Sequence, residues 1–220
     1  MSRSLSSIEK LNDAIDKELS WRKQELALIR SQMYMQPNDG SVAFFLKMRS
    51  SVALLYAHWE GSIKNIAQLY LNHVFAQDKL YKELRLNFIA VAIKGSALRW
   101  MQSEKVSLHT QYLTHFSDML DKPIHKLPQN IIKTESNLTS SVLAEILKTI
   151  GIDTTEFEVD YKLIDSSLVK NRNEVAHGEM LKEQGFDKKR YIELHDTVIK
   201  LIETFSKLVK DAAMEESYLS

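Results

Sequence analysis

Two long stretches of apolar residues at helical spacing, separated by one short break, constrain the fold of this chain most strongly. Apolar side chains recur every three or four residues over 7–35 and again over about 41–76. Between these stretches, Pro37-Asn38-Asp39-Gly40 is a strong turn signal. A connection this short joins antiparallel neighbours. The sequence therefore predicts a hairpin of two long helices, and the spacing of Ser6 and Glu9 predicts a capping box at the start of the first.

The middle of the second predicted helix, residues 51–60, is apolar on most of its sides. Such a helix lies either in the centre of a bundle or in an oligomer interface, and the pattern favours neither. Trp59 is predicted to be a core residue. The chain has only 6 Gly and 3 Pro in 220 residues, which favours long helices over the many turns of an all-β fold. The fold class is therefore predicted to be all-α.

The remaining chain predicts further helices around a less regular middle. The predicted helices are 80–101 with an interruption at Gly95-Ser96, 139–150 ended by Gly151, 163–177 ended by Gly178, and 187–214. Residues 103–133 are irregular in pattern and contain Pro123 and Pro128, which predicts loops and short helices. We expect a single domain over 1–220 with an insertion at 95–135. Residues 154–160 are predicted to be a linker with a short extended piece, and the polar tail 215–220 is predicted to fray.

Composition excludes several classes of protein. The 29 basic residues balance 29 acidic ones, which argues against wholesale coating of nucleic acid but allows a local basic cleft. The chain has no cysteine, so it has no disulfide, thiolate nucleophile or cysteine-based zinc site. No run approaches the roughly 20 apolar residues of a membrane span, and the first residues lack an apolar signal core. These features predict a soluble cytoplasmic protein that does not bind membranes.

Standard catalytic motifs are missing from the sequence. No pair among the 7 histidines has the spacing of a metal-binding motif, so no metal site is expected. The sequence has no Gly-x-Ser-x-Gly elbow, no phosphate-binding Gly-Lys-Ser/Thr loop and no dinucleotide fingerprint. We therefore expect no cofactor.

The segment Lys170 to Gly178 is the strongest candidate for a functional centre. Asn171, Arg172 and Asn173 interrupt an apolar helix where its inward face would continue, and His177 stands directly before the helix-ending Gly178. One interpretation is structural: Arg172 extends to solvent or pairs with Glu174, and His177 occupies a helix C-terminus, where a cation is favoured. The other interpretation is phosphoryl-transfer chemistry on RNA.

That chemistry needs few protein groups. A base deprotonates the ribose 2′-hydroxyl, an acid protonates the departing 5′-oxygen, and a cation stabilises the phosphorane oxygens. Histidine suits the first two roles because its pKa is near neutral. Arginine suits the third because it is permanently charged and its forked donors match phosphate oxygens. No metal is required, and the substrate must be RNA because DNA lacks the attacking hydroxyl.

Helix geometry separates the two charged residues of this segment. Five residues turn a side chain by about 140° on a regular helix, so Arg172 and His177 do not share a face within one chain. A single histidine is also one group short where the acid and the base are separate residues. A two-fold dimer removes both difficulties, because two facing copies supply two arginines and two histidines. The catalytic hypothesis therefore requires a homodimer.

The pattern Arg172, Asn173 and His177 on the penultimate helix of an all-α chain resembles the HEPN superfamily. Its signature is an arginine, commonly followed by a polar residue, with a histidine four to six residues further on. The segments Trp21–Leu26, Leu55–Lys64, Ser136–Thr139 and Arg172–Glu179 occur in the same order as in stand-alone HEPN proteins of the RiboL-PSP and MAE types. The resemblance covers most of the chain and is weakest over about 95–135.

The resemblance implies a HEPN-type bundle around an antiparallel core, dimerisation through the motif-bearing helices and metal-independent endoribonuclease activity. Such proteins are often toxins or phage-defence effectors, so an antitoxin or a defence-system partner is implied as well. Carried over by position, Arg172 and His177 are catalytic, and Asn173 orients the histidine or the scissile phosphate. Some HEPN proteins are not catalytic. The alternatives are therefore a dimer that binds RNA or nucleotide or regulates a toxin or restriction-system partner, and a purely structural scaffold.

Several other residues have both a structural and a functional interpretation. Glu60 and Lys64 are spaced as an ordinary helix ion pair, or one of them reaches the cleft to tune His177 or bind RNA. Lys170 and Glu174 complete the auxiliary candidates beside the motif. Basic residues near the motif form either a rim for the RNA backbone or an ordinary solvated face; these are Lys170, Lys182, Lys188, Lys189 and Arg190. His195 is expected to be a partly buried polar residue of the last helix.

Overall fold

The computed structural model describes residues 5–37, 40–124, 130–179 and 187–220. These residues form helices and connecting turns, with no strand among them beyond two isolated bridges. The elements are α1 (Ile8–Met35), α2 (Val42–Val74), η2 (Tyr81–Glu83), α3 (Leu86–Met101), α4 (Val106–Met119), α5 (Ser140–Ile150), α6 (Thr155–Glu158), α7 (Tyr161–Leu163), η3 (Ile164–Val169), α8 (Lys170–Ala176) and α9 (Lys188–Met214). The predicted all-α fold class is confirmed.

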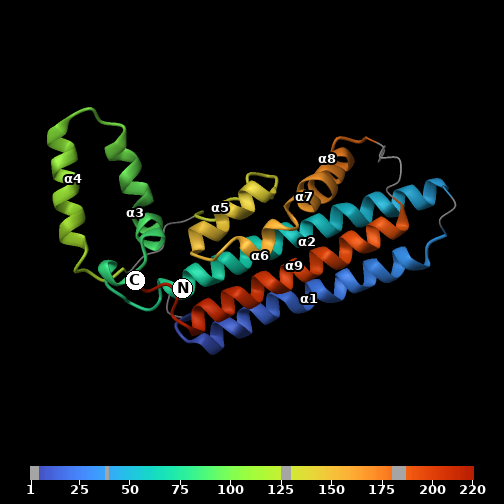
Figure 1. Ribbon diagram of the computed structural model, residues 1–220, viewed down its shortest axis with the longest axis horizontal. Coiled ribbons are helices and arrows are strands. Elements are labelled where there is room, and N and C mark those ends of the chain that lie inside the picture. The colour runs from blue at the N-terminus through green and yellow to red at the C-terminus, as the bar shows by residue number, and fades with distance from the viewer. Residues whose placement is uncertain (1–4, 38–39, 125–129, 180–186) are drawn as a thin grey trace.

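Helices α1, α2 and α9 lie side by side and form the main bundle (Figure 1). The apolar middle of α2 lies at the centre of this bundle, because α2 packs against α1 and α9 and also against α5 and α8. Val52, Leu55 and Trp59 are completely buried there. The sequence left open whether this stretch lies in the bundle centre or in an oligomer interface, and the structure places it in the bundle centre. The prediction that Trp59 is a core residue is confirmed.

Each of the three bundle helices α1, α2 and α9 starts at a residue whose side chain caps it. The hydroxyl of Ser41 accepts a hydrogen bond from Phe44 N at 3.1 Å, and the carboxylate of Asp187 accepts one from Arg190 N at 2.9 Å. In α1 the capping residue is Ser7, whose hydroxyl accepts from Lys10 N, so the predicted capping box at Ser6 was wrong by one residue. Adjacent serines give the same composition signal, and only the backbone conformation separates them.

A second layer of shorter helices lies across α2 (Figure 1). Helix α5 ends at Gly151, which adopts the predicted left-handed conformation with φ +72°. Residues 154–160 contain α6 rather than the predicted extended piece. The predicted single helix over 163–177 is interrupted by η3, a six-residue π-helix whose wide turn is seen in the bond from Lys170 N to Asp165 O. Such π-helical turns are rare and frequently occur at functional sites.

Helices α3 and α4 form a hairpin that stands away from the bundle (Figure 1). Helix α3 runs through Gly95 without the predicted interruption, because a glycine is tolerated inside a helix at modest cost. Helix α4 is a regular element of 14 residues in a region where the pattern predicted loops and short helices. It has no fully buried residue, and the ring of Tyr112 stacks on Phe116 of α4 and lies tilted against Trp100 of α3.

The polar tail is docked rather than frayed, which corrects the prediction for 215–220. Tyr218 is 1% exposed, and its carbonyl accepts a hydrogen bond from Arg85 N at 2.9 Å. Ser220 N donates to Glu83 O at 2.9 Å, so the tail closes against the segment between η2 and α3. One buried aromatic side chain is enough to anchor a segment whose average composition is polar. Within the described residues, no helix has the length and apolarity needed to cross a membrane.

Candidate functional site

The motif-bearing segment begins directly after the π-helix η3, and α8 presents Arg172 toward α2. The side chain of Arg172 is half-buried, and its Cζ atom lies 4.6 Å from the centroid of the Tyr56 ring. This stacking of a guanidinium on an aromatic face is a favourable cation–π contact. Arg172 is therefore held against the bundle. It does not extend into solvent, which was one of the two structural expectations for this residue.

The hydrogen bonds of Arg172 go to neutral groups. Its Nη1 atom donates to the amide oxygens of Asn137 and Asn173, both at 2.9 Å. Arg172 forms no ion pair with any carboxylate of the described residues, so the alternative expectation of a pair with Glu174 is not met. Because amide oxygens carry no net charge, the positive charge of the guanidinium is oriented but not neutralised.

Asn137 reaches Arg172 from a tight turn at residues 134–139. Two successive residues of this turn, Glu135 and Ser136, have positive φ angles of 52° and 64°. The turn is attached to α2 through Leu138, which is completely buried: its N–H donates to Tyr56 Oη at 2.7 Å, and its carbonyl accepts from Trp59 Nε1 at 3.5 Å. Both backbone polar groups of Leu138 are thus satisfied by side chains of α2.

Tyr56 connects α2 to both the turn and the arginine. Burial raises the pKa of Tyr56 to about 12, and the nearby Glu60 carboxylate adds to the rise. The hydrogen bond from Leu138 N and the charge of Arg172 oppose this shift but do not cancel it. Tyr56 is therefore a neutral phenol at physiological pH, and it serves as a hydrogen-bond acceptor and a stacking platform.

His177 stands at the other end of α8 and is exposed. It is the C-cap residue, its backbone N–H donates to Asn173 O at 2.9 Å, and Gly178 ends the helix with φ +76°. Glu179 N then donates to Glu174 O at 2.8 Å and closes the helix terminus. Within one chain the half-buried Arg172 and the exposed His177 therefore have different environments, as expected from their spacing.

Of the other predicted site residues, some lie beside Arg172 and its contacts and others are exposed on the surface. Asn173 contacts Arg172, and Glu60 lies close enough to Tyr56 to raise the pKa of that phenol. Lys64 is exposed on α2, and no Glu60–Lys64 ion pair forms among the described residues. Lys170 is exposed at the start of α8. Glu174 is partly buried, and its Oε2 atom has no hydrogen-bond partner in the described chain.

The predicted basic rim is only partly available to a ligand. Lys188 Nζ donates to the carbonyl oxygens of Tyr34 and Gln36 at 2.9 and 3.0 Å, so it closes the end of α1. Lys189 is highly exposed and lies 3.9 Å from Glu193. Lys182 lies outside the described residues. His195 was predicted to be a partly buried polar residue, and it is completely buried, with one ring nitrogen 3.0 Å from Leu26 O.

Sequence reasoning assigned no role to the two residues outside α8 that contact Arg172. Tyr56 and Asn137 both fall in segments that carry the family resemblance, Leu55–Lys64 and Ser136–Thr139. That resemblance was a usable signal for their importance. Their contacts with Arg172 could not be found from spacing, because these residues lie far from Arg172 in the chain.

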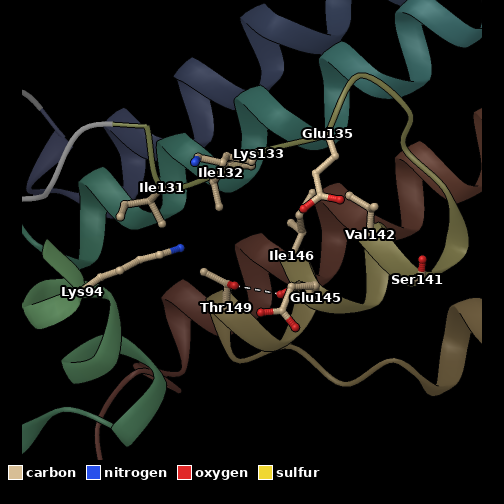
Figure 2. Close-up of a pocket in the computed structure, with 10 residues that line it drawn as sticks. All are labelled: Lys94, Ile131, Ile132, Lys133, Glu135, Ser141, Val142, Glu145, Ile146 and Thr149. Atoms are coloured by element: carbon tan, nitrogen blue, oxygen red, sulfur yellow. Dashed lines mark hydrogen bonds between the residues drawn. The ribbon is translucent and has the colours of Figure 1, made fainter. Parts of the chain in front are cut away.

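A cavity of about 300 Å³ lies between α3, α5 and the segment 131–135, and Figure 2 shows the side chains that line it. Lys94 and Lys133 approach it from one side, and Glu135 and Glu145 from the other (Figure 2). None of the predicted site residues lines this cavity. Among the described residues, no cluster of three or more potential metal ligands occurs.

The structure is thus an all-α bundle in which Arg172 lies in the first turn of α8 and His177 is the C-cap residue of the same helix. The family model described as RiboL-PSP-HEPN matches residues 17–211, and the chain belongs to this family. The match confirms the resemblance inferred from the motif segments. Domains of the HEPN class are often ribonucleases or RNA-binding modules. Comparison with curated proteins and comparison with solved structures each gave no match.

Proposed function

We propose that this protein is a metal-independent endoribonuclease that works as a homodimer and leaves 2′,3′-cyclic phosphate and 5′-hydroxyl ends. The observation that carries the proposal is the environment of Arg172. The guanidinium is half-buried, stacked on Tyr56 and bonded to two neutral amide oxygens, without a carboxylate partner in the described chain. A fixed arginine whose charge is not neutralised is suited to bind an anion such as a phosphate.

One edge of the Arg172 guanidinium remains available for substrate. Only Nη1 donates to described residues, whereas Nε and Nη2 form no hydrogen bond with them. Two parallel donors on one edge match two oxygens of a phosphodiester. As the phosphorus becomes pentacoordinate, negative charge grows on those oxygens. Arg172 then stabilises the transition state more than the bound substrate, which raises kcat.

The acid–base chemistry is assigned to His177 of each chain. One neutral imidazole takes the proton of the 2′-hydroxyl while that oxygen forms a bond to phosphorus. The bond from phosphorus to the 5′-oxygen then breaks, and the imidazolium of the other copy gives its proton to that oxygen. The exposed position of His177 at the end of α8 allows a second chain to approach it. Each chain thus supplies half of the site.

The cellular role that we propose is that of a toxin or phage-defence effector restrained by an antitoxin or a partner protein. Support for this role comes from family membership and from the intact Arg172 and His177. Expression of the wild-type chain should slow growth of a bacterial host, and expression of the His177→Ala variant should not. Equal growth of both strains at equal protein level would contradict the toxic role while leaving the chemistry open to direct assay.

The decisive experiment compares RNA cleavage by the purified wild type and variants, with analysis of the product ends. His177→Ala and Arg172→Ala should each lower the cleavage rate by at least about 100-fold, because each removes a transition-state group. His115→Ala is the matched control, since His115 is also an exposed histidine and lies on the distant α4. EDTA should leave the rate unchanged. Cleavage by His177→Ala at the wild-type rate would refute the mechanism.

One observation favours a non-catalytic alternative, a dimer that binds RNA or nucleotide or regulates a toxin or restriction partner. The imidazole of His177 is exposed, and no described side chain orients it by a hydrogen bond. Catalysis requires an oriented histidine, whereas binding through Arg172 does not. RNA binding that Arg172→Ala weakens, without cleavage by the wild type, would establish this alternative.

A further inference from the structure

Arg172 depends on groups outside its own helix for its orientation. Helix α8 has only seven residues, and within it the guanidinium donates one hydrogen bond, to the amide oxygen of the neighbouring Asn173. An arginine side chain with several rotatable bonds is not fixed by one such contact. The remaining restraints are the ring of Tyr56 and the amide oxygen of Asn137.

The turn that carries Asn137 is anchored on both sides. On one side Leu138 is bonded through its N–H to Tyr56 and through its carbonyl to Trp59. On the other side Ser140 N donates to Asp165 Oδ1 of η3 at 2.8 Å. The turn 134–139 is thus fixed to α2 and to the π-helix that directly precedes α8.

We propose that Asn137 is a positioning residue for Arg172, and that the turn 134–139 transmits the position of α2 to the guanidinium. This inference rests on the proposed function, because it assigns the alignment of the arginine in that reaction. Tyr56 has two tasks in this arrangement: its ring supports the guanidinium, and its hydroxyl holds the turn that presents Asn137.

The chemistry of the amide explains why an asparagine suits position 137. Its amide oxygen accepts a hydrogen bond from Nη1 without neutralising the guanidinium. An aspartate would accept the same bond but would pair with the charge that a phosphate needs. The proposal therefore distinguishes two losses, the loss of alignment in Asn137→Ala and the loss of available charge in Asn137→Asp.

The test measures kcat, KM and the affinity for an RNA whose 2′-hydroxyl at the cleavage site is methylated. Asn137→Ala should lower kcat about 10- to 100-fold with KM changed less than about threefold, because alignment acts mainly in the transition state. Asn137→Asp should weaken binding of the methylated RNA about 10-fold or more. Asn65→Ala is the matched control, since it removes an exposed amide from α2.

A double-mutant cycle separates positioning from a merely structural role. Asn137→Ala should cause no further loss of kcat in the Arg172→Ala background, because the group that it positions is already gone. Tyr56→Phe keeps the ring but removes the acceptor for Leu138 N–H, and it should lower kcat about 3- to 10-fold. Thermal unfolding confirms that each variant is folded.

The outcomes distinguish this inference from the proposed function. If Arg172→Ala cleaves RNA like the wild type, the proposed function fails. If Arg172→Ala is inactive but Asn137→Ala and Tyr56→Phe have the wild-type kcat, the proposed function stands and the positioning role is refuted. Equal losses for Asn137→Ala in the wild-type and Arg172→Ala backgrounds would also refute it.

Discussion

At the scale of single residues, Gly61 shows how a side chain that is missing on one helix makes room for a charge on another. Arg22 of α1 is 7% exposed, and its Nη2 atom lies 2.6 Å from Glu18. Its Nη1 atom is 3.5 Å from Nδ1 of the buried His58. A Cβ atom added to Gly61 would come within 2.7 Å of both terminal nitrogens of Arg22. The glycine therefore allows the guanidinium to lie against the backbone of α2.

The effect of replacing Gly61 on the free energy of unfolding should change sign when Arg22 is replaced as well. Gly61→Ala should lower the free energy of unfolding by about 1–2 kcal/mol, because the clash with Arg22 outweighs the better helix propensity of alanine. In the Arg22→Ala background the clash is gone, and the same substitution should raise it by roughly 0.5–1 kcal/mol. Urea unfolding of the four proteins measures both effects. Destabilisation of equal size in both backgrounds would show that Arg22 is not the obstacle.

At the scale of elements, the sequence predicts what local chemistry determines. Neighbouring residues and the period of the apolar pattern determine the hairpin of α1 and α2 and the glycines that end α5 and α8. These features are present within one or two residues of their predicted positions. Local reasoning was therefore sufficient for the helices that build the bundle.

Features that depend on distant partners were not predictable in the same way. No spacing rule in the sequence predicts the six-residue π-helix η3, in which Asp165 accepts a hydrogen bond from Ser140 N of α5. Helix α4 lacks a buried stripe, so the pattern gave no helical period to detect. The tail is fixed by the buried side chain of Tyr218 and by backbone hydrogen bonds to Glu83 and Arg85, which are distant in the sequence.

The candidate site likewise contains residues that the local sequence indicates and residues that only tertiary contacts identify. Arg172, Asn173 and His177 stood out because polar residues interrupt an apolar helix just before a glycine. Tyr56 and Asn137 contact Arg172 through the tertiary fold, and no spacing rule connects them to it. The sequence thus identified the residues proposed for chemistry, while the structure identified the residues that hold the arginine. The catalytic roles themselves stay a prediction until cleavage is measured.

At the scale of the whole molecule, three buried histidines make the free energy of unfolding depend on pH. Burial lowers the pKa of His58, His73 and His195 below the usual 6.5. The charge of Arg22 lowers that of His58 further, whereas Glu25 opposes the shift. Asp196 opposes it at His195. Each histidine is therefore more easily protonated in the unfolded chain than in the folded one.

The sign of this linkage predicts acid destabilisation in a defined window. The stabilising contribution of the three neutral histidines is complete above about pH 6.5 and is lost as the pH falls toward their lower folded pKa values. The urea midpoint should therefore decrease between pH 7.5 and pH 5. Because the pKa of Asp196 is lowered below 3.8, its protonation affects only a more acidic range. A midpoint that is constant from pH 7.5 to 5 would contradict the prediction.

The proposed half-site makes a quantitative prediction for mixtures of two forms of the whole chain. If each active centre needs His177 from both subunits, a dimer with one His177→Ala chain is inactive. After unfolding and refolding together at a one-to-one ratio, random pairing leaves about one quarter of the dimers fully wild type. Cleavage per total protein should then fall to roughly one quarter of the wild-type value, whereas independent subunits would retain about one half. Mixing without refolding is the control, since preformed dimers that do not exchange would also give one half. A refolded mixture that keeps half of the activity would therefore show that each subunit is catalytically complete, and would remove the reason for placing the two histidines in one centre.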